Sequence, residues 1–189
     1  MNAVIVGLGS EIARNLAIRL TADGWSVTGC SRRDPAFPSV HWDLAIFAAG
    51  TMEPIGRFFE TDKNEWAQSV CVNALNVLSD LRSLWPLRNE GAQVVFMGGP
   101  NMKHPNATYS AFRCGKALLE AIVLPLNHEY PEHRFMVLHP GVVRTKIHQQ
   151  TIAAGHRAAN IERIRRVVSG EEQTVTHDEV YAKLKDLIA

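Results

Sequence analysis

Tyr109 and Lys116 lie in a stretch where a strand, a loop and a helix follow one another. Residues 94–97 are all apolar and predict a buried strand, which Gly98 and Gly99 end. Tyrosine and lysine side chains are among the groups that move protons in enzymes. In a doubly wound α/β fold the loop after a strand lies at the carboxyl edge of the sheet, where ligands bind. This stretch is therefore the first candidate for a catalytic site.

A second candidate site follows the apolar run of residues 3–6 near the start of the chain. Glycines come next, and then apolar residues recur every fourth position, which predicts one face of a helix with Ser10 as its N-cap. Glycine lets a backbone approach phosphate closely, and the free N–H groups of a helix N-terminus bind anions. Unless this is a tight turn without a ligand, the residues that hold a phosphate are Gly7, Gly9, Ser10, Glu11 and Ile12.

Two arginines follow the second predicted strand, residues 26–30. In a dinucleotide-binding fold the end of this strand meets the adenosine ribose, where an acid binds the 2′-hydroxyl and an arginine accommodates a 2′-phosphate. Arg32 and Arg33 stand there in place of an acid, so the sequence favours NADP(H) over NAD(H). The alternative is a solvated arginine pair.

The composition is that of an ordinary soluble protein. The chain has 189 residues, of which 46% are hydrophobic and 21% charged, so a single domain over residues 1–189 is expected. A net charge of +1 gives no reason to expect nucleic acid or a membrane surface as a partner. The three cysteines lack metal-ligand spacing and indicate reduced thiols, so no metal site is predicted. The short apolar start has no basic region before it, and we expect a cytoplasmic protein.

The elements that must position these residues alternate along the chain. Apolar runs typical of strands buried on both faces alternate with amphipathic helices, which predicts a three-layer, doubly wound α/β fold with a mainly parallel sheet of about six strands. Pro35 and Pro38 argue against a helix after the arginines and leave at most a short edge strand there. The clearer strands are residues 3–6, 26–30, 44–47, 94–97 and 135–138.

Two long helices should cover this sheet. The first is expected over residues 62–84, with Thr61 as its N-cap. The second, over residues 107–128, contains Pro125, which should kink it.

The last part of the chain is also predicted to be helical. Residues 152–168 are amphipathic and basic, which indicates either a functional surface or simply a solvated helix face. Thr176 and Glu179 have the spacing of a capping box and predict the start of a final helix.

Several segments resemble the short-chain dehydrogenase/reductase family, and the resemblance covers residues 1–148 well. That family has a Rossmann fold and reads Gly-x-x-x-Gly-x-Gly after its first strand. Gly7 matches, whereas Glu11 and Ala13 stand at the other two positions, and a Glu11 side chain turned inward would repel a pyrophosphate. The family's Asn-Asn-Ala-Gly is similar to the stretch ending in Ala48, Ala49 and Gly50, where small residues let a cofactor ribose approach.

Two further motifs extend the resemblance. Asn73, in VCVNAL, resembles the family's catalytic asparagine, although a core amide bonded to backbone is the alternative. HPGVVRTKI resembles the family's Pro-Gly-x-x-x-Thr loop, which lies against the nicotinamide. The resemblance implies cofactor contacts there from Pro140, Gly141, Val143 and Thr145.

Two alignments with the family's Ser and Tyr-x-x-x-Lys compete. If Tyr109 is the family tyrosine, Arg113 replaces the lysine and Phe96 occupies the serine position inside a strand. If Phe112 is at the tyrosine position, Lys116 is the lysine and Gly99 stands where the serine belongs.

We prefer the second alignment because GKALLEA matches the family's helix and Gly99 lies just beyond the strand. It keeps Asn73 and Lys116 but lacks the serine and tyrosine hydroxyls that hold the substrate carbonyl and transfer its proton. Tyr109 lies one turn before Phe112 and could substitute as the acid, or it could simply be an exposed loop tyrosine.

The resemblance implies an NADP(H)-dependent oxidoreductase that acts on a small carbonyl or alcohol substrate, with Asn73, Lys116 and Tyr109 as its catalytic residues. It also implies a substrate lid over residues 149–175, and a homodimer or homotetramer formed through the long helices. The alternative, favoured by Gly99 and Phe112, is a catalytically silent nucleotide-binding or scaffold protein of the same fold.

Overall fold

In the part of the chain that the structure describes, five parallel strands form a central sheet in the order β2-β1-β3-β4-β5. The computed structural model describes residues 1–33, 37–99 and 107–189. The sheet has one strand fewer than expected, because residues 37–41 form none and residues 34–36 lie outside the described part. The strands are β1 (Asn2–Val6), β2 (Ser26–Cys30), β3 (Trp42–Phe47), β4 (Arg88–Met97) and β5 (Arg134–Leu138).

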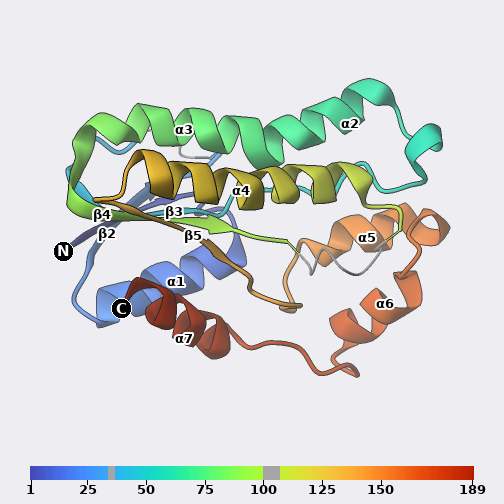
Figure 1. Cartoon of the computed structure of the whole chain (residues 1–189). Helices are drawn as coiled ribbons and strands as arrows, with labels where there is room; N and C mark the ends of the chain where they lie inside the picture. The colour runs from blue at the N-terminus through green and yellow to red at the C-terminus, as the bar shows by residue number, and fades with distance from the viewer. Residues whose placement is uncertain (34–36, 100–106) are drawn as a thin grey trace.

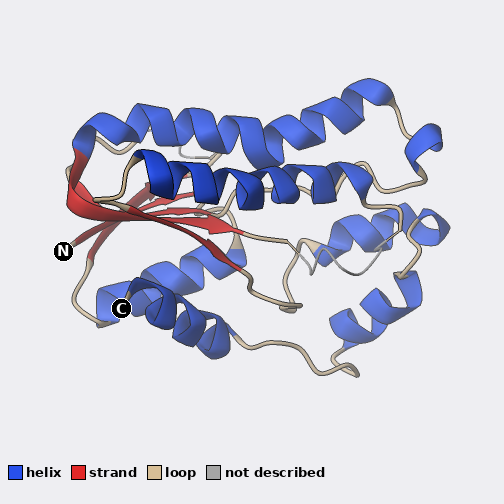
Figure 2. Cartoon of the chain, in the orientation of Figure 1, coloured by secondary structure: helices blue, strands red, loops and turns tan. Residues whose placement is uncertain are grey.

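Helices cover both faces of the sheet, as the sequence predicts for a three-layer fold (Figures 1 and 2). One face carries α1 (Glu11–Ala22) and α7 (His177–Ile188). The other carries α2 (Lys63–Val70), the π-helical turn η2 (Cys71–Leu75), α3 (Asn76–Leu84), the short η3 (Trp85–Leu87) and α4 (Ser110–Glu129).

Each face of the sheet has its own hydrophobic core, and alternate residues of a strand pack into one core or the other. In β1, Ile5 packs in the cluster with α1 and α7, whereas Val4 and Val6 pack in the cluster with α3 and α4. A strand between two helical layers buries both of its faces, which is why its sequence reads as an uninterrupted apolar run.

The first long helix differs from its prediction in two respects. Its N-cap is Asp62 and not Thr61, because the Asp62 carboxylate accepts hydrogen bonds from the N–H groups of Asn64 and Glu65. The helix is also interrupted by η2, so one predicted helix becomes α2 and α3 joined by a π-helical turn. Helix α4 is continuous, with Pro125 inside it.

The amphipathic segment near the end of the chain forms α5 (His148–Ala154), the single turn η4 (Gly155–Arg157) and α6 (Ile161–Ser169). We call residues 148–169 the lid, since Figure 1 shows α5 and α6 beyond the carboxyl ends of the strands. The capping box of Thr176 and Glu179 at the start of α7 is confirmed. Within the described ranges, no helix is both long and apolar enough to span a membrane.

Candidate functional site

The strand order reverses between the carboxyl ends of β1 and β3, and in doubly wound sheets ligands bind outside the strands at this point, which we call the crevice. Gly7 follows β1 there with a φ of +99°, and a Cβ on it would lie 2.6 Å from the Ala49 nitrogen. Only glycine therefore permits this close approach of the two backbones. The structure thus brings together the predicted Gly7 and the small residues Ala48, Ala49 and Gly50.

The N-terminus of α1 opens onto this crevice. Ser10 is its N-cap, as predicted, and the hydroxyl accepts from the Ala13 N–H at 3.5 Å. Within the described residues, the backbone N–H groups of Gly9, Glu11 and Ile12 make no hydrogen bond. Unpaired N–H groups at the positive end of a helix dipole form an anion site, which fits the diphosphate of a dinucleotide.

Lys116 is buried on α4 beside Gly50, with 3% of its surface exposed. A Cβ on Gly50 would lie 3.5 Å from the lysine Nζ and 2.8 Å from Oδ1 of Asn73, so both side chains converge on this backbone. Burial lowers the pKa of Lys116 to about 8. Among the described residues its ammonium has a contact with the Phe112 ring, 5.9 Å from the centroid, but no hydrogen bond. A buried donor of this kind fits the hydroxyl groups of a ribose.

Asn73 is fully buried in the π-helical turn η2, and its amide is bonded to backbone. Nδ2 donates to the carbonyls of Ser69 and Thr51 at 2.9 Å each, and Oδ1 accepts from the Thr51 N–H at 3.2 Å. These bonds match the alternative of a core amide. They fix the segment after Gly50, so Asn73 positions the crevice wall. π-Helical turns occur frequently at functional sites.

The positions of the second alignment meet in space. A Cβ on Gly99 would lie 3.0 Å from the Cβ and Cγ atoms of Lys116 and 3.9 Å from the Phe112 ring. Phe96, the serine position of the first alignment, is wholly buried in the core. The arrangement therefore supports the second alignment, with no hydroxyl on the side chain at either position 99 or 112.

His139 is a neighbour of this site that the sequence analysis missed. Its Nδ1 lies 3.1 Å from the Gly99 carbonyl oxygen, and its Nε2 lies 3.8 Å from the Glu120 carboxylate. The ring is about half exposed. The position of His139 directly after β5 and before a Pro-Gly pair could have marked it as a site residue. Nothing in the sequence, however, showed that β5 ends beside Gly99.

The loop after β5 crosses toward α1. Pro140 and Val143 are buried, while a Cβ on Gly141 would lie 2.7 Å from a Val175 methyl, at a φ of +80°. The Thr145 carbonyl accepts from the His148 N–H and leads the chain into α5. The predicted cofactor-contact residues of this loop thus lie between β5 and the lid.

The two predicted adenosine-site arginines follow β2 at the same edge of the sheet. Arg32 and Arg33 are exposed, and the Arg33 N–H donates to the Ser31 hydroxyl at 3.2 Å. This position fits a 2′-phosphate and equally fits two solvated side chains.

The lid is fastened to the start of α4 through Tyr109. The tyrosine is 6% exposed and packs with Ile55 and Ala154. Its hydroxyl donates to Oδ1 of Asn160 at 2.6 Å and lies 3.1 Å from the Thr151 hydroxyl. Burial raises the pKa of Tyr109, which makes it a weaker acid. These contacts argue for a lid anchor and against the predicted role of substitute acid.

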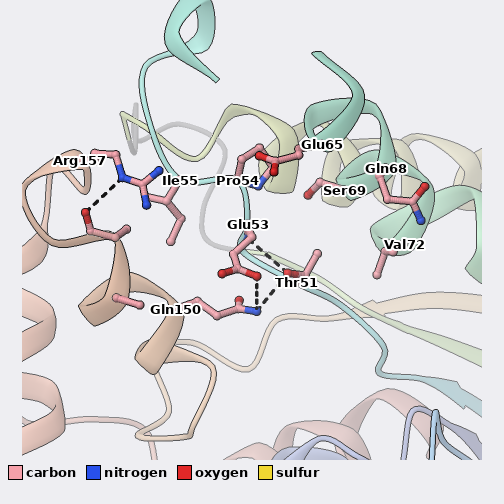
Figure 3. Close-up of a pocket in the computed structure, with 12 residues that line it drawn as sticks. Thr51, Glu53, Pro54, Ile55, Glu65, Gln68, Ser69, Val72, Gln150 and Arg157 are labelled. Carbon is pink, nitrogen blue, oxygen red and sulfur yellow. Dashed lines mark hydrogen bonds between the residues drawn. The ribbon is translucent and has the colours of Figure 1, made fainter. Parts of the chain in front are cut away.

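The lid also holds the segment of residues 51–57, which we call the strap. Gln150 accepts from the Met52 N–H at 2.8 Å and donates to the Thr51 hydroxyl at 3.1 Å. A cavity of about 430 Å³ lies between the strap, α2 and the lid (Figure 3). The polar residues that line it include Thr51, Glu53, Glu65, Gln68, Gln150 and Arg157.

Replacing Tyr109 by phenylalanine separates its two possible roles. As an anchor, the residue contributes a buried hydrogen bond, so Tyr109→Phe should lower the free energy of unfolding by about 1 kcal/mol and speed proteolysis of the lid. Thr151→Val should have a smaller effect in the same direction, because it removes one of the two contacts of the Tyr109 hydroxyl and leaves the tyrosine in place. A fall of about 10²–10⁴-fold in kcat, with an unchanged lid and an active Thr151→Val, would instead identify an acid.

Comparisons with known proteins agree with this geometry. The sequence model of the short chain dehydrogenase family matches residues 36–155. The chain belongs to this family. An uncharacterized oxidoreductase of Schizosaccharomyces pombe is 29% identical over 104 residues, a match that spans 54% of this chain and 42% of that relative.

Solved structures share the fold. A small-chain dehydrogenase in complex with NADPH is 16% identical with a TM-score of 0.83, covering 100% of this chain and 90% of its own. A 3-alpha-hydroxysteroid dehydrogenase from Pseudomonas sp. B-0831 complexed with NADH is 17% identical with a TM-score of 0.77, over 100% and 90% of the two chains. At these identities the likeness establishes the fold alone.

Proposed function

We propose that the chain binds NADP(H) along the carboxyl edge of its sheet and acts as an oxidoreductase on a small carbonyl or alcohol. The observation that carries this proposal is that two sets of donors at the carboxyl edge of the sheet have no hydrogen-bond partner among the described residues. They are the N–H groups at the start of α1 and the buried Lys116 ammonium. The bound nicotinamide would supply hydride chemistry.

Each part of the cofactor has residues suited to it. The N–H groups of Gly9, Glu11 and Ile12 would bind the diphosphate, and the Lys116 ammonium would donate to the nicotinamide ribose. Arg32 and Arg33 would pair with the 2′-phosphate that distinguishes NADP(H). The loop from Pro140 through Thr145 would lie against the nicotinamide.

The cavity beneath the strap is the proposed place for the substrate. Its volume of about 430 Å³ lies within the range of small-molecule sites, and Thr51 borders both the cavity and the Asn73 network. The carboxylates of Glu53 and Glu65 and the amides of Gln68 and Gln150 favour a polar, hydroxylated compound over an apolar one.

A second function is favoured by the absent hydroxyls. Gly99 and Phe112 cannot hold or protonate a carbonyl, and the Tyr109 hydroxyl is bonded to the lid. A nucleotide-binding or scaffold protein without turnover would keep the crevice and lose the acid. A cytoplasmic location, and the absence of nucleic-acid and membrane partners, remain predictions.

We expect NADPH to bind more tightly than NADH. Loss of the phosphate pairing should cost about 1.5–3 kcal/mol, as for hydrogen bonds between charged groups. Titration calorimetry with both dinucleotides measures the difference, and an Arg32→Ala/Arg33→Ala variant should abolish it. The remote pair Arg165 and Arg166 on α6 provides a matched double-alanine control. Equal affinities for the two cofactors in the natural chain would refute the preference.

We also propose that the chain forms a homodimer or homotetramer through α3 and α4. Leu75 and Leu124 lie on this helical layer with 49% and 68% of their surfaces exposed. Two-fold pairing is the commonest oligomeric symmetry. Sedimentation equilibrium at micromolar concentration should show a dimer or tetramer that Leu124→Glu converts to monomer. A monomeric natural chain at that concentration contradicts the proposal.

A further inference from the structure

The Glu11 carboxylate reaches out of the first turn of α1 and binds the loop after β5. Its Oε2 accepts the Lys146 N–H at 2.5 Å, a contact between residues 135 positions apart. In the sheet, β3 and β4 separate β1 from β5. The contact therefore joins the start of α1 to the loop after β5, at the carboxyl edge of the sheet where a dinucleotide would lie.

This bridge brings a negative charge to the anion site itself. Glu11 is the residue whose own N–H, with that of Ile12, is left unpaired at the positive end of the helix dipole. A diphosphate bound by those N–H groups would meet the carboxylate at close range, and like charges a few ångströms apart repel even near water. The contact with Lys146 would then have to break.

Two residues of α5 also bind other parts of the chain. Gln150 joins the lid to Thr51 and Met52 of the strap, and Thr151 contacts Tyr109. The loop after β5 leads directly into α5, so the Glu11 contact and the Gln150 contacts hold one continuous segment in place. For a dinucleotide to bind at the start of α1, the Glu11 contact would have to break. The Gln150 contacts lie beside the cavity lined by the strap and need not break.

We propose that Glu11 is a built-in competitor of the cofactor diphosphate and thereby sets the affinity of the chain for dinucleotides. The inference rests on the proposed function, because it concerns the same crevice. The carboxylate belongs to the first turn of α1, where the anion site lies, and it ties the lid-side loop to that helix. Binding of the cofactor displaces the Glu11 carboxylate. The natural chain therefore binds a dinucleotide more weakly than a chain with the same N–H donors and no carboxylate at position 11.

Titration calorimetry with NADPH tests this on the natural chain, Glu11→Gln and Glu11→Ala. Glutamine keeps an oxygen that can accept from Lys146 but removes the charge, whereas alanine removes both. We expect affinity to rise on the order of tenfold in Glu11→Ala, with Glu11→Gln between it and the natural chain. Glu90→Gln, an exposed position in β4 away from the crevice, makes the same change in net charge and should have no effect.

Hydrogen exchange of the Lys146 amide gives a readout that needs no cofactor. This amide should exchange slowly in the natural chain and rapidly in Glu11→Ala. Rapid exchange in the natural chain would show that the contact does not form, and would overturn the inference.

The outcomes separate this inference from the proposed function. Tighter binding by the Glu11 variants supports both, including the case in which only the variants bind. Equal binding by the natural chain and both variants overturns the role of Glu11 and leaves the proposed function standing. If none of the proteins binds NADPH, both are wrong.

Discussion

A Phe112→Tyr variant should reduce a generic carbonyl compound with NADPH about 10²–10⁴ times faster than the natural chain, which is the range a general acid contributes. Phe112 stands on α4 one turn before Lys116, whose ammonium lies 5.9 Å from the ring centroid. A phenol placed there would have a lowered pKa in the field of that charge. Steady-state assays of NADPH oxidation measure the effect.

The matched control keeps the new hydroxyl and removes the charge. Because Lys116→Met should also weaken dinucleotide binding, the comparison is made at saturating NADPH. There Phe112→Tyr/Lys116→Met should lose most of the gain, since the tyrosine would no longer be activated. Gly99→Ser would restore the second hydroxyl but is harder to accommodate. The serine Cβ would lie 3.0 Å from the Lys116 side chain, which would have to shift. If Phe112→Tyr binds NADPH and still shows no turnover with any carbonyl tried, the silent-binder function is favoured.

Lys116→Met should stabilise the fold at pH 7 while weakening dinucleotide binding. Burial lowers the pKa of Lys116 from 10.5 to about 8, and a shift of that size corresponds to about 3 kcal/mol of destabilisation at neutral pH. Methionine fills a similar volume without a charge to desolvate. Urea unfolding of both proteins measures the gain, and calorimetry measures the loss of affinity.

The advantage of the methionine should depend on pH with a defined sign. Between pH 8 and 10.5 the unfolded lysine holds a proton that the folded one has released, so stability of the natural chain rises with pH in this window. The difference from Lys116→Met should therefore shrink as pH is raised from 8 toward 10.5. Lys63→Met, at the exposed start of α2, should show no such trend. A difference that is constant with pH would mean that Lys116 is not desolvated.

The layers and the main strands were predictable from sequence because each depends on a local pattern. A strand buried on both faces must be apolar along its whole length, as residues 3–6 and 94–97 are. The caps at Ser10 and Thr176 depend on side chains that reach only three residues along the chain. The thirteen-residue spacing between positions 99 and 112 likewise placed Gly99 beside Lys116 and Phe112.

The features that escaped prediction depend on contacts between distant segments. The apolar spacing of residues 62–84 fits one continuous helix, and the π-helical turn at Asn73 interrupts it. The position of Tyr109 one turn before Phe112 suggested an acid, but its partners Thr151 and Asn160 come from the lid. No local sequence pattern predicts which distant residues such a side chain will contact in the folded chain.

A crystal structure of the chain grown with NADPH tests the central claim most directly. The account predicts the diphosphate on the N–H groups of Gly9, Glu11 and Ile12, with the Glu11 carboxylate withdrawn from Lys146. It also predicts a ribose hydroxyl within hydrogen-bonding distance of the Lys116 Nζ. A dinucleotide bound elsewhere, or a crevice still closed by Glu11 at saturating NADPH, would contradict it.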